Sequence, residues 1–223
     1  SNFIGGQLLI EGFEIKGDTN TGAAIMADFC GADDDHPGFA PGKVVIQNNV
    51  INSAMGGINF WGNENCTDGK TPFAENFEIK NNTFSGIGIA GSKQGYGIVL
   101  ERLSSWAEAG NQYAGLVSGN TFSDIRSKSA NLLEAGVGVV INLPVTPVDT
   151  GTANVQILSN TFGSGIGANL AVFTADASGA KVELNNLGNG ALGVFEGSAA
   201  GTLNATKNWW GAATGPVVAQ LSG

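Results

Sequence analysis

Three short apolar segments in the first half of the chain each end on a residue that could carry chemistry. They end at Asp28, Trp61 and Glu101, and a long polar stretch follows each of them. Those stretches hold most of the acidic clusters of the chain and its only histidine, His36. Long connections over a regular scaffold are where proteins usually carry their function. We therefore expect a candidate site where these three segments end.

Asp33, Asp34 and Asp35 form the densest acidic run in this region. Carboxylates and loop carbonyls are the hard oxygen ligands that calcium takes, so the run indicates a metal site with Ca²⁺ as the candidate cofactor. The alternative interpretation is a solvated acidic turn that binds no ion. The sequence leaves both interpretations open.

Aromatic residues in the same region suggest a second kind of site, one for carbohydrate. Trp61 and Trp106 offer flat apolar faces on which a sugar ring can pack, and Asn59 and Glu101 can bond its hydroxyl groups. These four residues are the candidate ligand-binding set. The alternative is that either tryptophan packs only against its own loop.

Catalysis is the third possibility for this region. Hydrolysis of a glycosidic bond needs two carboxyl groups about 5 to 9.5 Å apart, and Glu101 with either Asp28 or one of the aspartates at 33–35 would supply such a pair. A polysaccharide lyase needs a base beside a calcium that acidifies the proton to be removed, and Arg102 is the candidate base. The sequence does not decide whether the chain is an enzyme.

The elements that must position these residues form a repeat. The stretch 77–84 (FEIKNNTF) recurs at 44–51, 115–122, 155–162 and 203–210, at intervals of roughly 33 to 48 residues. Intervals of this size are typical of solenoids. One asparagine holds the same position in every copy, and a shorter copy is expected around Val182, Leu184 and Asn186. The five aligned asparagines are Asn49, Asn82, Asn120, Asn160 and Asn208.

A second alternating segment follows each of these asparagines, clearest at 57–61, 97–101 and 138–142. Short strands with Gly and Asn at the bends, and no helical period, describe one turn of a β-solenoid. We predict an all-β, single-stranded, right-handed parallel β-helix of about seven coils, with long loops on one side. Stacked copies would bond one another as an asparagine ladder. Residues 1–223 are expected to form a single domain, a segment of a larger secreted protein.

The repeat also predicts which side chains face inward and outward. Phe13 and Ile15 are expected inside the first coil, and Trp209 and Trp210 are expected to close the end of the core. An outward row is expected along the coils, and its late members with Val140 would form an exposed apolar contact stripe unless the loop around Pro144 and Pro147 covers it. The expected row is Asp28, Trp61, Glu101, Asn142, Phe173 and Phe195.

Cys30 and Cys66 lie in long connections about one coil apart, leaving the same edge of the predicted helix. A disulfide that joins the two loops is the favoured interpretation, and it fits a periplasmic or extracellular protein. A catalytic pair of a cysteine with His36 is the alternative, but it lacks a local sequence signature.

The repeated pattern I-x-x-N-x-F, closed by N-W-W-G at 208–211 and T-G-P at 214–216, resembles the right-handed parallel β-helix of the pectin-lyase-like superfamily. The resemblance covers about residues 8–216 and implies the fold. That architecture carries lyases, hydrolases, esterases, phage spikes and adhesins, so it does not by itself imply a function. The G-H-G and R-I-K motifs of the polygalacturonase-like members are absent. The fit is better to non-catalytic secreted or cell-surface members that end in an N-W-W-G coil.

Composition limits the partners. The formal net charge of −9 argues against nucleic acid and anionic membranes, which both favour basic faces, and no run of about 20 apolar residues could span a membrane. We expect a secreted, extracellular or cell-surface protein that serves adhesion, assembly or glycan contact without turnover. Its partners would be a polysaccharide or cell-surface glycan, copies of itself or other surface proteins. The alternative is a polysaccharide lyase or glycoside hydrolase acting over coils one to three.

Overall fold

The computed structural model describes thirteen stretches of the chain, which include the strands named below. Residues 27, 28, 61, 76, 101, 114, 178, 221 and 222 are described by their backbone. The expected sites at residues 29–42, 62–75 and 102–113 lie outside the described residues. The described ranges are 7–17, 22–28, 43–52, 55–61, 76–88, 95–101, 114–126, 136–141, 155–173, 177–189, 192–197, 201–216 and 221–222.

The described strands form three sheets, and every strand pairing is parallel. Sheet A contains β1 (Gln7–Glu11), β4 (Lys43–Gln47), β7 (Asn76–Lys80), β10 (Ala114–Ser118), β13 (Val155–Leu158) and β16 (Ala180–Glu183). Sheet B contains β2 (Glu14–Lys16), β5 (Val50–Asn52), β8 (Thr83–Ile87), β11 (Thr121–Ile125) and β14 (Thr161–Phe162). Sheet C contains β3 (Ala23–Asp28), β6 (Gly56–Trp61), β9 (Tyr96–Glu101), β12 (Val137–Ile141), β15 (Ala168–Val172), β17 (Leu192–Glu196) and β18 (Leu221–Ser222). A 3₁₀ turn, η2 (Ala177–Gly179), precedes β16.

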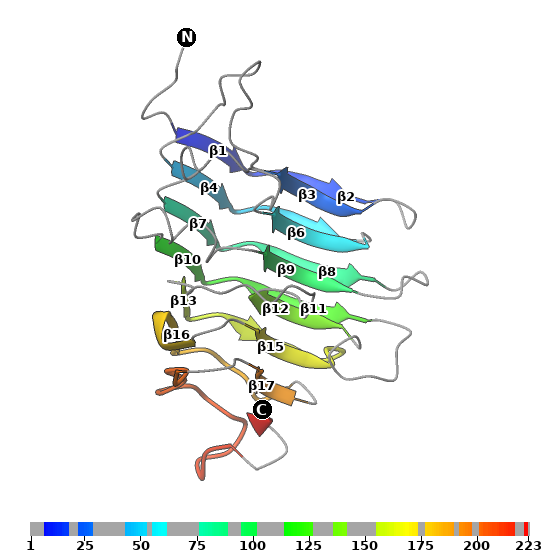
Figure 1. Ribbon diagram of the computed structural model, residues 1–223. Coiled ribbons are helices and arrows are strands. Elements are labelled where there is room, and N and C mark those ends of the chain that lie inside the picture. Colours follow the sequence, from blue (N-terminus) through cyan, green and yellow to red (C-terminus); the bar gives the residue numbers. More distant parts are fainter. Residues whose placement is uncertain are drawn as a thin grey trace.

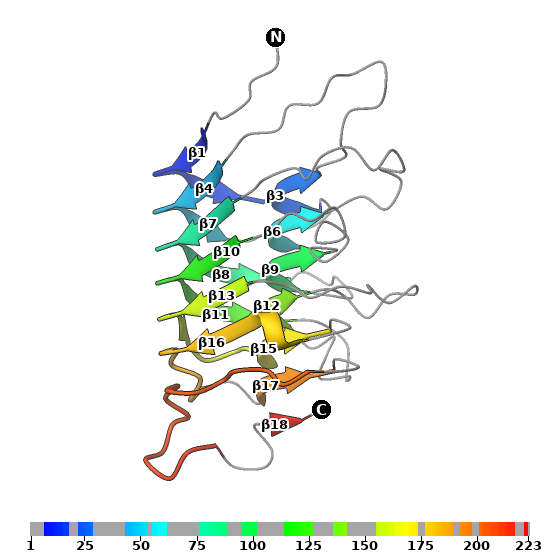
Figure 2. The ribbon, with the colours of Figure 1, turned by 60° about the vertical axis from the view of Figure 1, so that its left-hand side comes forward.

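The chain visits the three sheets in turn and then steps down by one strand, so each circuit forms one coil of a solenoid (Figures 1 and 2). The protein is therefore a parallel β-helix, as the repeat predicts. It has about six coils: five are complete triplets, and β16 and β17 belong to the sixth. The expected seventh coil is represented in the described residues only by isolated bridges at Asn204 and Trp209 and by β18. No helix in the described ranges has the length and apolar character needed to cross a bilayer.

The core fills the inside of the coils, because alternate residues of each strand point inward. Strand pairing aligns like with like along the axis: Ile10, Ile46, Ile79, Val117, Ile157 and Val182 form one inward row of sheet A. In sheet B, Phe84, Phe122 and Phe162 stack with ring centroids 4.8 Å apart. That distance matches the spacing of neighbouring strands, about 4.8 Å, so the rings stack at the pitch of the backbone.

A row of glycines in sheet C makes room for this phenylalanine stack. A Cβ added at Gly57, Gly97 or Gly138 would lie 2.5 to 2.8 Å from a ring of the stack. In the fifth coil the pairing puts Asn169 in the glycine position, and in the sixth Leu187 replaces phenylalanine. Leucine is smaller than phenylalanine, so Leu187 leaves room for the side chain of Asn169. Asn169 Nδ2 donates to the Leu187 carbonyl at 2.9 Å.

The predicted asparagine ladder is present in the interior. Asn49, Asn82, Asn120 and Asn160 are all buried. The Oδ1 atoms of Asn82, Asn120 and Asn160 each accept from the backbone N–H and the side-chain amide of the ladder residue one coil earlier, at 2.9 to 3.0 Å. Each Nδ2 also donates to a backbone carbonyl of the preceding coil. Both ends of every side-chain amide are thus used, which is the condition for burying a polar group without loss.

At both ends of the ladder, the structure differs from the positions expected from the sequence. In the sixth coil the rung is Asn185, not Asn186, because Leu184 takes the left-handed conformation (φ 61°) that precedes each rung. In the first coil the rung position belongs to Phe13, whose backbone N–H donates to Asn49 Oδ1 at 3.0 Å. Phe13 is 58% exposed, so the expectation that it faces inward is wrong, whereas Ile15 packs against the core as expected.

The C-terminal tryptophans divide between two roles. Trp210 aligns with Leu187 and Phe162, is 8% exposed, and belongs to the core. Trp209 is 51% exposed, because it aligns with the outward residues Thr161 and Asn186. The expectation that both rings close the core therefore holds for Trp210 and is wrong for Trp209.

Candidate functional site

The carboxyl ends of the first three sheet-C strands bring three sequence-predicted residues into one row. Pairing places Asp28 opposite Trp61 and Trp61 opposite Glu101. The three lie two residues beyond Met26, Asn59 and Val99, and side chains two apart on a strand share a face. Asn59 lies between Ile58 and Phe60, which point into the core, so this face is the outer one. These residues therefore share one edge of the rod in coils one to three.

Among the sequence-predicted site residues on these three strands, Asn59 is the one whose side chain the structure describes. Its Oδ1 is buried and makes no hydrogen bond. A buried acceptor without a donor costs about 1 to 3 kcal/mol, so such an atom is uncommon unless it serves another purpose. The Asn59 amide thus holds an unpartnered acceptor on the side of sheet C that the sequence favours for ligand binding.

The other candidates of this region lie outside the described residues. They are the acidic run Asp33, Asp34 and Asp35, the cysteines Cys30 and Cys66, and Arg102 and Trp106. In the part of the chain that the structure describes, no group of three acidic, histidine or cysteine side chains is close enough to hold a metal ion. The calcium site, the disulfide and the catalytic roles of Asp28, Glu101 and Arg102 stay predictions.

Further along the same face, the expected exposed apolar stripe is wrong in two respects. Pairing places Phe195 opposite Ala171 and hence in the row of Val140, not in the row of Phe173. Val140 is only 1% exposed, and it belongs to a second apolar cluster on the outside of sheet C with Val137, Ala168, Ala171 and Leu192. Phe173 and Phe195 pack on that cluster with ring centroids 5.3 Å apart. Val140 is buried and the two phenylalanines are partly buried, so the three do not form a fully exposed stripe.

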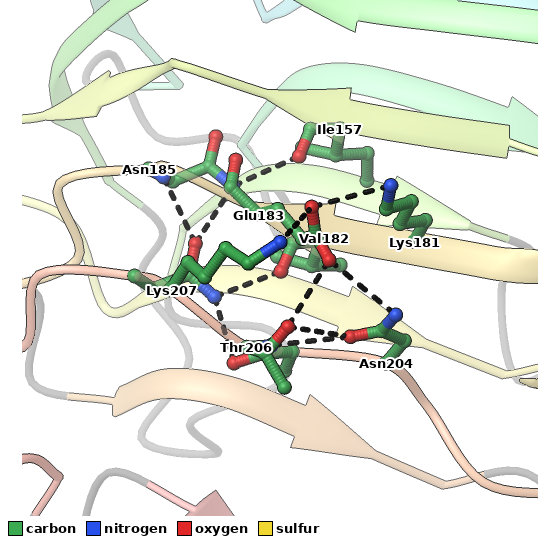
Figure 3. Close-up of polar contacts among 10 residues, drawn as sticks. Ile157, Lys181, Val182, Glu183, Asn185, Asn204, Thr206 and Lys207 are labelled. Atoms are coloured by element: carbon green, nitrogen blue, oxygen red, sulfur yellow. Dashed lines mark hydrogen bonds and ion pairs between the residues drawn. The ribbon is translucent and has the colours of Figure 1, made fainter.

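A different polar group, which the sequence did not suggest, lies on the outside of sheet A near the C-terminus (Figure 3). Glu183 is 6% exposed, and its Oε2 lies 3.2 Å from Lys181 Nζ and 3.7 Å from Lys207 Nζ. Thr206 Oγ1 donates to Glu183 Oε1 at 3.1 Å. Because Thr206 and Lys207 belong to the segment after β17, the carboxylate ties the last turn to the sixth coil.

The charge of Glu183 follows from these contacts. Burial raises its pKa, but the hydrogen bonds from Lys181 and Thr206 and the nearby ammonium groups outweigh burial, so the pKa lies below the ordinary value. Glu78 in the third coil is held similarly: Lys43 and Lys80 each lie 2.6 Å from one of its oxygens. These hydrogen bonds are the main reason that the pKa of Glu78 is also lowered. Both groups are ionised at neutral pH and join neighbouring elements, which describes a structural role.

The C-terminal end of the rod contains a pocket of about 760 Å³. Its described walls are mainly apolar, with Val194, Leu203, Ala205, Trp210 and Pro216. Glu196 also lines it, and the Oε2 of Glu196 is buried. Pockets of 300 to 1,000 Å³ with apolar walls and few polar groups are typical of small-molecule sites.

No family model, curated protein or solved structure matches this chain. The parallel β-helix is therefore known from the structure itself, and no family is assigned. Any function has to be argued from the residues of the two regions described above.

Sequence reasoning missed the pocket, although one signal was present. In the repeat, the last residue of β17 aligns with Phe60, Leu100, Ile141 and Val172, and in this chain it is Glu196. An acid in a position that is otherwise apolar is a departure that can be read from aligned copies.

Proposed function

We propose that the protein is a rigid rod that binds a polysaccharide or cell-surface glycan without turning it over. The binding face is the outer side of sheet C in coils one to three. The observation that supports it best is the buried, unpartnered Oδ1 of Asn59, which lies beside the aligned Asp28, Trp61 and Glu101. A sugar hydroxyl that donates to this oxygen would recover the hydrogen bond that the folded chain lacks.

The chemistry of the face fits a glycan better than it fits a peptide or a nucleic acid. Two carboxylates and an amide oxygen accept hydrogen bonds from hydroxyl groups, and an indole ring offers an apolar face to the C–H side of a sugar. The negative net charge of −9 disfavours polyanions unless calcium bridges the two. Neutral glycans, or acidic ones in the presence of calcium, are the favoured ligands.

Several finer features belong to the same proposal. The resemblance to pectin-lyase-like β-helices, in particular to surface members that end in an N-W-W-G coil, supports a secreted or cell-surface protein that serves adhesion or assembly. A disulfide between Cys30 and Cys66 would suit that location. The acidic run at Asp33, Asp34 and Asp35 would hold calcium near the same edge. Copies of the protein or other surface proteins are further candidate partners.

A glycoside hydrolase is the second candidate, and one observation favours it. Asp28 and Glu101 are separated by two strand spacings, roughly 9.5 Å along the rod, because Trp61 lies between them. That separation is at the upper end of the range for inverting hydrolases. Arg102, the candidate base of a lyase, follows Glu101 directly in the sequence.

The test is a binding and activity screen on neutral and acidic polysaccharides, with and without calcium. Asn59→Leu should weaken glycan binding about tenfold or more while the melting temperature stays the same or rises, because leucine has a similar size and removes the unpartnered acceptor. Trp61→Ala should weaken binding to a similar extent. The matched control is Gln156→Leu, which also replaces a side-chain amide by leucine but at an exposed residue on the outside of sheet A, and it should leave binding intact.

Two results would overturn the proposal. One is glycan binding that survives both Asn59→Leu and Trp61→Ala, or the absence of binding to any glycan in the panel. The other is chain cleavage by the wild type that disappears in Glu101→Gln or Asp28→Asn, which would show an enzyme at this face.

A further inference from the structure

The last turn of the rod departs from the earlier coils in one inward row of sheet A. A bridge between Lys181 and Asn204 aligns Ala205 with Val182. In the six coils before the last turn this row holds a β-branched residue each time: Ile10, Ile46, Ile79, Val117, Ile157 and Val182. Alanine is smaller than any of these, so the last turn leaves space where the earlier coils are filled.

Ala205 lines the pocket of about 760 Å³ at this end of the rod. The described walls come from β17 and from the segment 201–216, which follows β17 at the end of the rod (Figure 2). Val194 and Trp210 are buried members of the main core, and Leu203 and Ala205 pack against that core. The pocket is therefore a continuation of the apolar interior.

The ionisable residues of the described lining already have partners within the chain. Lys207 Nζ lies 3.7 Å from Glu183 Oε2, on the outside of sheet A. Glu196 has an interaction of its own with another group of the chain. A charged ligand would thus enter an apolar pocket without a free counter-charge among the described residues, which is costly.

We propose that this pocket binds an uncharged small molecule with a compact apolar body. The body packs against Val194, Leu203 and the Trp210 ring, in the space that β-branched side chains fill in the earlier coils. A hydroxyl or similar group of the ligand faces outward, where Thr202 is exposed at the pocket. The burial of apolar surface supplies the affinity. This site lies at the opposite end of the rod from the proposed glycan face and does not depend on it.

The experiment uses three probes with the same apolar cage and different charge: 1-adamantanemethanol, 1-adamantanemethylamine and 1-adamantanecarboxylate. The melting temperature of the full chain is measured at neutral pH as each probe is added, because a molecule that binds only the folded state raises it. The alcohol should raise it most, and the Kd of the alcohol should be about tenfold or more below that of either ion.

Two pairs of variants locate the effect. Leu203→Gln makes one wall polar at a similar size and should weaken binding of the alcohol about tenfold or more. Its matched control is Leu184→Gln, the same change at a residue that is 59% exposed and outside the described lining, which should leave binding intact. The alcohol should change the tryptophan fluorescence of Trp209→Phe but much less that of Trp210→Phe, because Trp210 and not Trp209 belongs to the described lining.

A further variant separates binding from folding. Ala205→Ile restores the residue type of the row, so it should melt at the same or a higher temperature than the wild type while it binds the alcohol more weakly. The proposal fails if none of the probes raises the melting temperature, if either ion raises it as much as the alcohol, or if binding of the alcohol is unchanged in both Leu203→Gln and Ala205→Ile. Self-association of the free chain that Ala205→Ile abolishes would also contradict it, because the occupant of the pocket would then be a second copy.

Discussion

The middle coils and the last coils of this β-helix are built on the same positions but with different residues. In coils three to five, stacked phenylalanines lie over glycines, and the other inward rows are aliphatic. In the last two turns, Leu187 and Trp210 take the phenylalanine position, Asn169 has replaced a glycine one coil earlier, and Glu196 ends an apolar row. The backbone register continues through both regions while the side-chain chemistry changes.

This difference shows where such a rod can carry function. A row that repeats the same residue in every coil is explained by stacking alone. Stacking does not explain a row in which the residue type changes without a packing reason. Changes of this kind are expected at functional sites. Asn59, on the outer face of sheet C, is a change of this kind.

The largest expected effect tests the regular part of the rod. Asn120→Ala removes an oxygen that accepts from Asn82 N and Nδ2, and removes the donor to the Ile79 carbonyl. All these groups are buried, so water cannot replace the lost partners. We expect the free energy of unfolding to fall by about 3 to 5 kcal/mol in chemical denaturation, since each orphaned group costs about 1 to 3 kcal/mol.

The matched variant is Asn208→Ala, at the last rung. It removes the same set of bonds to Asn185 and the Val182 carbonyl, but these are only partly buried. Solvent can then satisfy the groups left behind, and the loss should be about 1 to 2 kcal/mol. Equal losses at Asn120 and Asn208 would contradict the view that burial decides what a rung contributes.

Most of this architecture could be predicted from the sequence, because aligning the repeated copies shows which residues lie opposite one another in neighbouring coils. The residues Asn49, Asn82, Asn120 and Asn160 occupy the same position in successive copies, and all four are buried. The exceptions arose where one copy departs from the others. Phe13 holds a rung position that its side chain cannot use, and Leu184 holds a left-handed position that usually goes to Asn, Ser or Gly.

The candidate sites could be predicted less well, for a physical reason. A side chain that binds a ligand does not have to stack on its neighbour, so the repeat does not constrain its type. The aligned Asp28, Trp61 and Glu101 could be anticipated because they end strands. The Glu183 cluster could not, because it depends on Thr206 and Lys207, which lie more than twenty residues later in the sequence.

A smaller effect should test whether large and small residues compensate between coils. Phe77 and Gly115 are paired in neighbouring coils, and a Cβ at Gly115 would lie 2.2 Å from the Phe77 ring and meet no other group so closely. Gly115→Ala should therefore destabilise the fold by about 1 to 3 kcal/mol through overpacking. Asn169 and Leu187 show the same kind of exchange at the other end of the core.

The double variant decides whether this explanation is correct. Val44 and Val155 occupy the same row as Phe77 and Gly115, so Phe77→Val combined with Gly115→Ala gives a sequence close to that of the neighbouring coils. The double variant should be less destabilised than the sum of the two single variants, by about 1 kcal/mol or more. Additive losses would show that the alanine clashes with something other than the ring.

The smallest effect concerns pH and compares two carboxylates on the outside of sheet A. Glu183 and Glu78 both have a lowered pKa in the folded protein, so each contributes stability that is present above the unfolded pKa of about 4.3. That contribution is lost as the pH falls through the folded pKa, because the protonated acid no longer holds its lysines.

Between pH 7 and pH 3, Glu183→Gln should therefore lose less stability than the wild type in urea unfolding. Lys207→Met should reduce the pH dependence of stability less than Glu183→Gln does, because Lys181 Nζ remains 3.2 Å from Glu183 Oε2. If the stability of the wild type and of Glu183→Gln depended on pH in the same way over this range, the charge of Glu183 would not hold the last turn, and the hydrogen bonds from Thr206 and Asn204 would do so without it.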